Sequence, residues 1–198
     1  MIADSRTSVA FTGHRTYRGA AADALRRTVG ELYARGFRTF LSGMAVGFDL
    51  AAAEAVLELR ERAPGVRLVA AVPFRGQEMR FSPADRERFR RVLAEADSVE
   101  VLAPAYHRGC YAVRNDFLVD NARVLVAWYD GSPGGTRYTV RRALGRGLEV
   151  VTSVRRLPCR PPPNRRSSDK KAARRPRVVG RFVLRNFGSF FMQIYTSL

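Results

Sequence analysis

Three short segments of the sequence combine glycine with small or polar residues, as anion-binding turns do. They are Gly13-His14-Arg15, Ser42-Gly43-Met44-Ala45-Val46-Gly47-Phe48-Asp49 and Asp130-Gly131-Ser132-Pro133-Gly134-Gly135-Thr136. Glycine lets the backbone approach a phosphate closely, and the N–H groups at a helix N-terminus, with the positive end of the helix dipole, attract negative oxygens. One such turn often serves chain geometry alone. Three of them predict a ligand that carries phosphate.

The rest of the sequence predicts the elements that position these segments. Short β-branched runs alternate with longer helical patterns, which is typical of a parallel sheet covered by helices. We expect strands over residues 8–12, 39–42, 67–73, 98–102, 124–129 and 149–152. Helices are expected over residues 20–35, 47–62, 84–96, 111–122 and 136–146. The three segments then follow the first, second and fifth strands, at the carboxyl edge where open α/β sheets bind ligands.

Length and composition favour one domain with a distinct tail. The chain has 198 residues, of which 46% are hydrophobic, enough for one folded domain and too many for a wholly disordered chain. We expect residues 1–154 to form a Rossmann-like, three-layer α/β domain with a mostly parallel sheet. Residues 155–198 form a Pro/Arg-rich basic tail, for which we expect disorder over residues 164–177. Apolar residues beyond them have a spacing that suggests a short amphipathic helix.

Most of the net charge of +17 lies in this tail, where twelve Lys and Arg residues face a single acid. The tail has three interpretations: a nonspecific nucleic-acid arm, a segment that lies on an anionic membrane surface, or a linker or docked segment without a function of its own. The abrupt change in composition favours the last of these.

Several classes of protein lack their usual signals here. No apolar run reaches the ~18 residues that cross a bilayer, and the first residues do not have the pattern of an export signal, so we expect a cytoplasmic protein. Cys110 and Cys159 are expected to be reduced thiols. His14 and His107 are the only histidines, too few for a closed zinc site, and we expect no metal. No G-x-G-x-x-G follows the first expected strand and no P-loop motif is present, so we expect no required cofactor.

Four blocks of sequence, in order, match one known family. The first is Thr12-Gly13-His14-Arg15, and the second runs from Ser42 to Asp49 and continues with Ala52-Ala53-Glu54. The third is Arg114-Asn115-Asp116-Phe117-Leu118-Val119-Asp120, and the fourth is Tyr129-Asp130-Gly131 followed by Pro133-Gly134-Gly135-Thr136. Over residues 7–152 the chain thus resembles the YpsA-like branch of the SLOG superfamily. The resemblance implies a Rossmann-like domain that binds a nucleotide or a nucleotide derivative, such as ADP-ribose, NAD or a nucleoside monophosphate.

The resemblance leaves three functions open. In the lonely-guy phosphoribohydrolases of the superfamily, the Pro-Gly-Gly loop leads to a glutamate one helical turn later, whereas residues 137–142 of this chain contain no acid. Cleavage of a glycosidic bond passes through an oxocarbenium-like state that a carboxylate stabilises. The missing glutamate favours a sensor or regulator over a nucleotide N-glycosidase. DprA-like binding of single-stranded nucleic acid is the third alternative, and a homo-oligomer is compatible with all three.

The resemblance and the three segments together define the candidate site. The ligand-binding candidates are Gly13, His14, Arg15, Ser42, Gly43, Met44, Gly47, Asn115, Asp130, Gly134, Gly135 and Thr136. Arg15 and Arg114 are the expected phosphate partners, because a guanidinium forks onto two oxygens at once. In an enzyme, the catalytic candidates are Arg114 and a substitute carboxylate from Asp49, Glu54 or Asp130. Structural roles compete with these: Asp49 as a first-turn acid, Glu54 as solvated helix surface, and Asp130 as an Asx-turn residue.

Overall fold

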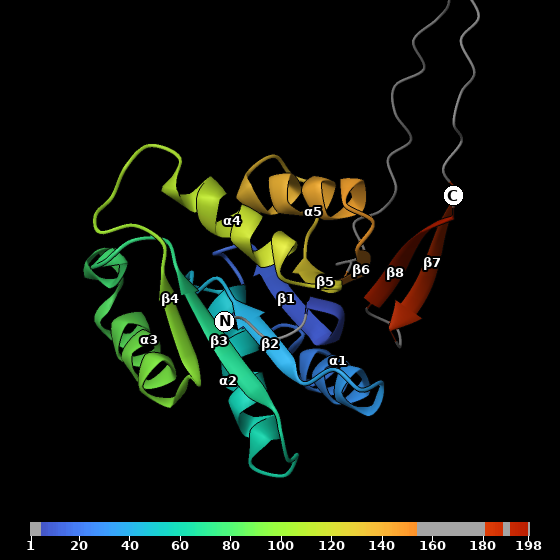
Figure 1. The fold of residues 1–198 in the computed structure, drawn as a ribbon, viewed down its shortest axis with the longest axis horizontal. Helices are drawn as coiled ribbons and strands as arrows, with labels where there is room; N and C mark the ends of the chain where they lie inside the picture. The colour runs from blue at the N-terminus through green and yellow to red at the C-terminus, as the bar shows by residue number, and fades with distance from the viewer. Residues whose placement is uncertain (1–4, 154–180, 188–190, 198) are drawn as a thin grey trace, which may run out of the picture.

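The alternation of short apolar runs with amphipathic segments produces a sheet covered by helices, seen in a computed structural model that describes residues 5–153, 181–187 and 191–197 (Figure 1). The first six strands are β1 (Ser8–Gly13), β2 (Thr39–Ser42), β3 (Arg67–Val72), β4 (Ser98–Val101), β5 (Val124–Trp128) and β6 (Glu149–Ser153). The helices are α1 (Ala22–Ala34), α2 (Phe48–Arg60), α3 (Pro83–Glu95), α4 (Cys110–Asp120) and α5 (Gly135–Gly145), with short 3-10 helices η1 (Ser5–Thr7) and η2 (Gln77–Arg80). The six strands and five helices expected over residues 8–152 all form, and the predicted fold class is confirmed.

The order of the strands places a topological switch point near the middle of the sheet. The six strands are parallel and lie in the order β4-β3-β2-β1-β5-β6. From β1 the chain moves outward to β2, β3 and β4, and then returns to place β5 and β6 on the other side. β1 and β5 are neighbours, with Gly13 in register with Trp128 at their carboxyl ends. Such a switch point is where open parallel sheets form their ligand crevice.

Two apolar layers hold the helices to the sheet. α1, α2 and α3 cover one face, and α4 and α5 cover the other (Figure 1). Phe11 and Phe40 belong to the core on the first face, and Leu41 and Leu125 to the core on the second. β1, β2 and β5 are buried along nearly their whole length. Burial on both faces explains why these strands are nearly continuous apolar runs rather than alternating ones.

Two further strands extend the sheet beyond β6. They are β7 (Arg181–Phe187) and β8 (Phe191–Ser197). β8 pairs antiparallel with β6, and β7 pairs antiparallel with β8. The backbone is therefore extended where the apolar spacing had suggested a short amphipathic helix, because Val, Ile and aromatic residues favour strands when a sheet edge is there to pair with. The domain boundary at residue 154 and the expected disorder over residues 164–177 lie outside the described residues.

Three features named in the sequence analysis concern membranes, thiols and metals. Within the described residues, every helix falls short of the length and apolar character needed to cross a membrane. Cys110 is a buried free thiol at the start of α4, whereas Cys159 lies outside the described residues. Over the same part of the chain, no group of three or more His, Cys, Asp and Glu side chains is arranged to hold a metal ion.

Candidate functional site

The loops that follow β1, β2 and β5 meet at the switch point. The backbone N–H of Phe48, at the start of α2, donates to the carbonyl of His14 over 3.4 Å. His14 also reaches the loop after β5, with its Nε2 3.0 Å from Oδ1 of Asp130. Gly47 packs so tightly on the loop after β1 that a Cβ there would lie 2.6 Å from the carbonyl oxygen of Arg15, and its φ of +85° is one that only glycine adopts readily. The three glycine segments therefore converge.

Two of the candidate glycines are needed for contacts within the protein itself. A Cβ on Gly13 would lie 2.5 Å from Cβ of Phe48. A Cβ on Gly43 would collide with the guanidinium of Arg114 and would lie 2.7 Å from Oδ2 of Asp49. The space that a phosphate would need beside these glycines is occupied by side chains of the protein.

Arg114 and Asp49 form a buried ion pair at the carboxyl edge. Nη1 of Arg114 lies 3.2 Å from Oδ2 of Asp49 and also donates to the carbonyl of Gly43, while Nε donates to Oδ1 of Asn115 over 2.8 Å. The two side chains are 8% and 4% exposed. Burial raises the pKa of Asp49 to about 6, although the charge of Arg114 opposes this shift, and burial lowers the pKa of Arg114. Each partner therefore depends on the other for its charge.

Ser42 and Met44 shape the loop after β2. The hydroxyl of Ser42 donates to the carbonyl of Asp49 over 2.8 Å and accepts from the backbone N–H of Met44 over 3.2 Å. Met44 is fully buried and has a φ of +56°. Gln77 of η2 donates from Nε2 to the Met44 carbonyl over 2.7 Å. Sequence analysis missed Gln77, and no local pattern indicates it, because its partner is 33 residues away.

His14 and Asp130 lie beyond the carboxyl ends of β1 and β5, with side chains 19% and 43% exposed. Oδ1 of Asp130 accepts from the backbone N–H of Ser132 over 2.9 Å. This hydrogen bond is the main cause of the lowered pKa of Asp130. The His14 ring packs near Tyr129, with ring centroids 5.9 Å apart. Asp130 thus forms the expected Asx turn and also faces His14 across the switch point.

The N-terminus of α5 is the open part of the site. Gly134 precedes the helix with a φ of +141° and no side chain caps the helix end. The first helical hydrogen bond runs from the N–H of Tyr138 to the carbonyl of Gly134, so the amides of residues 135–137 have no acceptor within the helix. A Cβ on Gly134 would meet no atom within 4 Å, and a Cβ on Gly135 would lie 3.7 Å from Nδ2 of Asn115. Free amides and the Asn115 amide group thus lie side by side.

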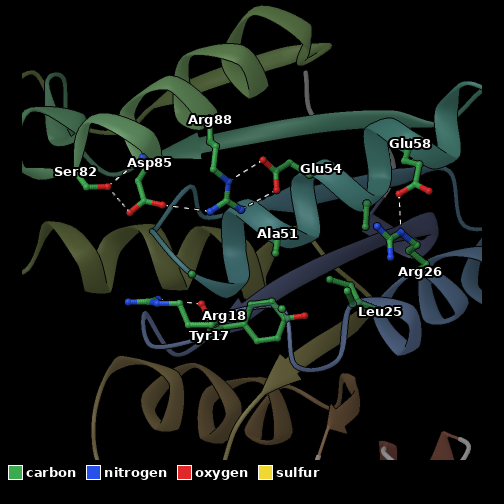
Figure 2. Close-up of a pocket in the computed structure, with 14 residues that line it drawn as sticks. Tyr17, Arg18, Leu25, Arg26, Ala51, Glu54, Glu58, Ser82, Asp85 and Arg88 are labelled. Carbon is green, nitrogen blue, oxygen red and sulfur yellow. Dashed lines mark hydrogen bonds and ion pairs between the residues drawn. The ribbon is translucent and has the colours of Figure 1, made fainter.

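Glu54 lies away from this site, on the face of α2 that points toward α3 (Figure 2). Arg88 contacts both of its oxygens, at 2.9 and 2.7 Å, and Arg91 contacts one at 2.9 Å. Glu54 and Arg88 border a hollow of about 690 Å3 lined by α1, α2, α3 and the loop after β1, with Ala51 among its lining residues. The structure therefore does not bring Glu54 to Asp49 and Arg114.

Aromatic side chains that the sequence analysis did not include lie next to the loop after β1. Tyr17 packs edge-on against Phe48 and Trp128, with ring centroids 5.4 and 5.0 Å away. On the other side of the loop after β1, the guanidinium of Arg15 lies over the ring of Tyr111, 5.2 Å from its centroid. The only sequence signal for these aromatic residues was that they lie close to the glycine segments or the Arg114 block along the chain.

Comparison with protein families shows the family to which the chain belongs. The model of the YspA SLOG family matches residues 10–149. The chain belongs to the YspA SLOG family. The matched residues of this family member include every residue of the candidate site.

Relatives of this YspA SLOG family member include UPF0398 proteins of bacteria. One from Halalkalibacterium halodurans is 29% identical over 135 residues, which cover 67% of this chain and 71% of that protein. Another, from Bacillus thuringiensis, is 28% identical over 127 residues, covering 63% of this chain and 69% of the relative.

Among solved structures, two DNA processing proteins A (DprA) share the fold. The protein from Streptococcus pneumoniae has a TM-score of 0.53 and 19% identity, and the match covers 72% of this chain but 48% of that one. DprA from Helicobacter pylori, a structure described for its single-stranded DNA binding mode, has a TM-score of 0.53 and 16% identity over 72% of this chain and 63% of its own. This chain thus spans about half to two thirds of these proteins, and the likeness concerns the fold alone.

Proposed function

We propose that the chain binds a nucleotide or a nucleotide derivative of the AMP, ADP-ribose or NAD type at the carboxyl edge of the sheet, and acts as a sensor or regulator. The observation that supports this most is the uncapped N-terminus of α5 beside Asn115, at the switch point between β1 and β5. In this proposal the nucleotide is a ligand and no further cofactor takes part.

The phosphate occupies the end of α5. The amides of Gly135, Thr136 and residue 137 point toward it, and the positive end of the helix dipole stabilises its charge. Nδ2 of Asn115 supplies a side-chain donor next to Gly135. His14 lies across the crevice and is held there by its contact with Asp130.

The carboxylates of the site favour binding over turnover. Asp49 is buried, and its Oδ2 is paired with Arg114, so this oxygen is engaged within the protein and the side chain is shielded from solvent. Asp130 is engaged by Ser132 and His14 at the mouth. The contacts that both carboxylates already make favour binding over the stabilisation of an oxocarbenium-like state, which a nucleotide N-glycosidase requires.

The first test is the binding of AMP, ADP-ribose and NAD to the full chain, by calorimetry and by the rise in melting temperature. Stabilisation follows RT ln(1 + [L]/Kd), so a ligand at one hundred times its Kd stabilises by about 2.7 kcal/mol. Gly135→Asp adds a negative charge where the phosphate is proposed to bind, yet an acid in the first turn favours the helix itself. We therefore expect the Gly135→Asp variant to fold and to bind the nucleotide with roughly tenfold or more lower affinity.

Two control variants separate this site from others. Gly30→Asp introduces the same charge in α1, where a Cβ would meet no atom within 4 Å, and should leave affinity unchanged. Ala51→Leu partly fills the hollow beside α2 and should also bind normally. Loss of binding in Ala51→Leu with normal binding in Gly135→Asp would move the site to that hollow and overturn the proposal.

The alternative functions have different signatures. Release of free base from AMP would identify an N-glycosidase instead of a sensor. An oligonucleotide that binds more tightly than AMP, with an affinity that falls steeply as salt rises, would favour DprA-like nucleic-acid binding, because each neutralised phosphate releases counterions.

A further inference from the structure

Three aromatic rings from separate segments gather next to the candidate site. Phe74 follows β3, Tyr106 follows β4 and Tyr111 is in the first turn of α4. The ring of Phe74 packs edge-on against Tyr106 and Tyr111, with centroids 5.4 and 5.8 Å away. Tyr106 and Tyr111 are 6.4 Å apart. We refer to these three residues as the aromatic ledge.

Two arginine side chains lie on the ledge. Arg15 lies over Tyr111 at 5.2 Å from the ring centroid, and Arg80 lies over Tyr106 at 5.0 Å. Within the described residues neither guanidinium forms an ion pair, although arginines such as Arg88 on α3 do. Tyr106 is 52% exposed, so one of the rings is open to solvent. A cationic, partly open aromatic surface matches a flat ring system attached to an anion.

The ledge is close enough to α5 for one ligand to span both. Tyr111 and Asn115 are four residues apart in α4, which places them one turn apart on the same face of the helix, with Cβ atoms about 6 Å from each other. Asn115 adjoins Gly135 at the start of α5. The ribose of a nucleoside 5′-phosphate bridges a gap of this size between its phosphate and its base.

We propose that the aromatic ledge is the base subsite of the crevice, where the base of the bound nucleotide stacks on Tyr111 beside Tyr106. The inference rests on the proposed function, because it takes the phosphate to lie at the N-terminus of α5. The guanidinium of Arg15 now covers the face of Tyr111 that the base takes, and it stacks on the outer face of the base or pairs with a phosphate once the nucleotide is bound. The chain thereby distinguishes nucleotides from sugar phosphates.

The test compares AMP with ribose 5-phosphate, which has the same phosphorylated sugar without a base. Stacking of a base on an aromatic side chain gives about 5- to 100-fold in affinity, so wild-type chain should bind AMP more tightly than ribose 5-phosphate by such a factor. Tyr111→Leu should lower the affinity for AMP to that for ribose 5-phosphate and should leave the affinity for ribose 5-phosphate unchanged. Tyr111→Phe keeps the ring and should keep the preference.

Two more variants distinguish a loss of base stacking from a folding defect. Tyr106→Leu removes the half-exposed ring of the ledge and should also lower the affinity for AMP without changing that for ribose 5-phosphate. Tyr33→Leu is the matched control, because the guanidinium of Arg38 lies over the Tyr33 ring at 4.1 Å, at the opposite end of the sheet. Melting temperatures are measured for each variant, and AMP binding by Tyr33→Leu should match the wild type.

The possible outcomes separate this inference from the proposed function. Equal binding of AMP and ribose 5-phosphate by the wild type would overturn the base subsite and leave the phosphate site standing. Binding of neither compound would overturn the proposed function, and the base subsite with it. A preference for AMP that survives in both Tyr111→Leu and Tyr106→Leu would overturn the assignment of the base to the ledge.

Discussion

His14 and Asp130 contact each other across the switch point, with Nε2 of one 3.0 Å from Oδ1 of the other. His14 follows β1 and Asp130 follows β5. The contact therefore links the ends of two neighbouring strands, from which the chain continues toward opposite edges of the sheet. The contact holds the carboxylate of Asp130 near the proposed phosphate position.

Asp130→Asn should strengthen the binding of AMP. The substitution removes a negative charge near the phosphate, worth roughly 0.5–1 kcal/mol at a half-exposed position, or about two- to fivefold in affinity. The amide oxygen of Asn still accepts from Ser132, so the Asx turn is retained. Calorimetry measures the affinity, with Asp120→Asn at the end of α4 as the control. Weaker binding by Asp130→Asn would show that Asp130 contacts the ligand directly.

Arg114→Met should strongly destabilise the protein, because it leaves Asp49 buried without its partner. Breaking a buried ion pair on one side costs about 3–5 kcal/mol, measured as the free energy of unfolding in urea. The double variant Arg114→Met/Asp49→Leu should recover part of the loss. Arg91→Met, which removes an exposed partner of Glu54, should cost less than about 1 kcal/mol. A loss of stability in Arg114→Met as small as that of Arg91→Met would contradict this account.

Asp49 should make the stability fall as pH rises from about 4 to about 6. Burial raises the pKa of Asp49 from 3.8 to about 6, so across this range the folded protein keeps a proton that the unfolded chain has released. Stability then decreases with pH, by at most about 3 kcal/mol, and this contribution levels off above the folded pKa. Urea unfolding at several pH values measures it. Asp49→Asn has no such proton, and identical pH dependence in both proteins would refute the assignment.

Gly13→Ala should destabilise the protein, because the added Cβ would lie 2.5 Å from Cβ of Phe48. Strain of this kind typically costs about 1–3 kcal/mol. The matched control is Gly30→Ala in α1, where the new methyl group meets no atom within 4 Å and alanine favours the helix by about 1 kcal/mol. Thermal unfolding should therefore shift in opposite directions for the two variants. Equal shifts would show that the loop after β1 relaxes freely.

Glu54→Gln should leave AMP binding unchanged and cost little stability. Glu54 is paired with Arg88 and Arg91 at a partly exposed position, where ion pairs contribute about 0–1 kcal/mol. Calorimetry and urea unfolding test the two halves of this prediction. If the variant lost a nucleotide-cleaving activity present in the wild type, the catalytic role that the sequence analysis considered would be restored.

The strands and helices could be predicted because burial on both faces of the sheet leaves an unambiguous pattern. β5 is a continuous apolar run, β1 and β2 are short buried segments with apolar residues at their centres, and each is bounded by a polar or glycine-containing segment. The convergence of the glycine segments followed from the rule that ligands bind at carboxyl ends of parallel strands. The separation of Glu54 from Asp49 was also accessible, because five residues along a helix turn the side chain well away from the first position.

The partners of individual side chains could not be predicted in this way. Arg114 was expected to bind phosphate, yet it pairs with Asp49, 65 residues away in the sequence. Phe74 lies in the loop after β3 and Tyr111 in the first turn of α4, so their contact depends on the order of β3 and β4 and the packing of α4. Such contacts are set by tertiary packing, which local spacing does not encode.

The ion pair of Arg114 and Asp49 crosses the end of the sheet, since α4 lies on one face and α2 on the other. Unfolding of α2 or α4 alone would leave the charge of the other partner buried without its counter-ion. This free-energy cost opposes the separate unfolding of either layer. The two layers should therefore open as one cooperative unit, and the backbone amides of α2 and α4 should exchange with deuterium at similar, slow rates.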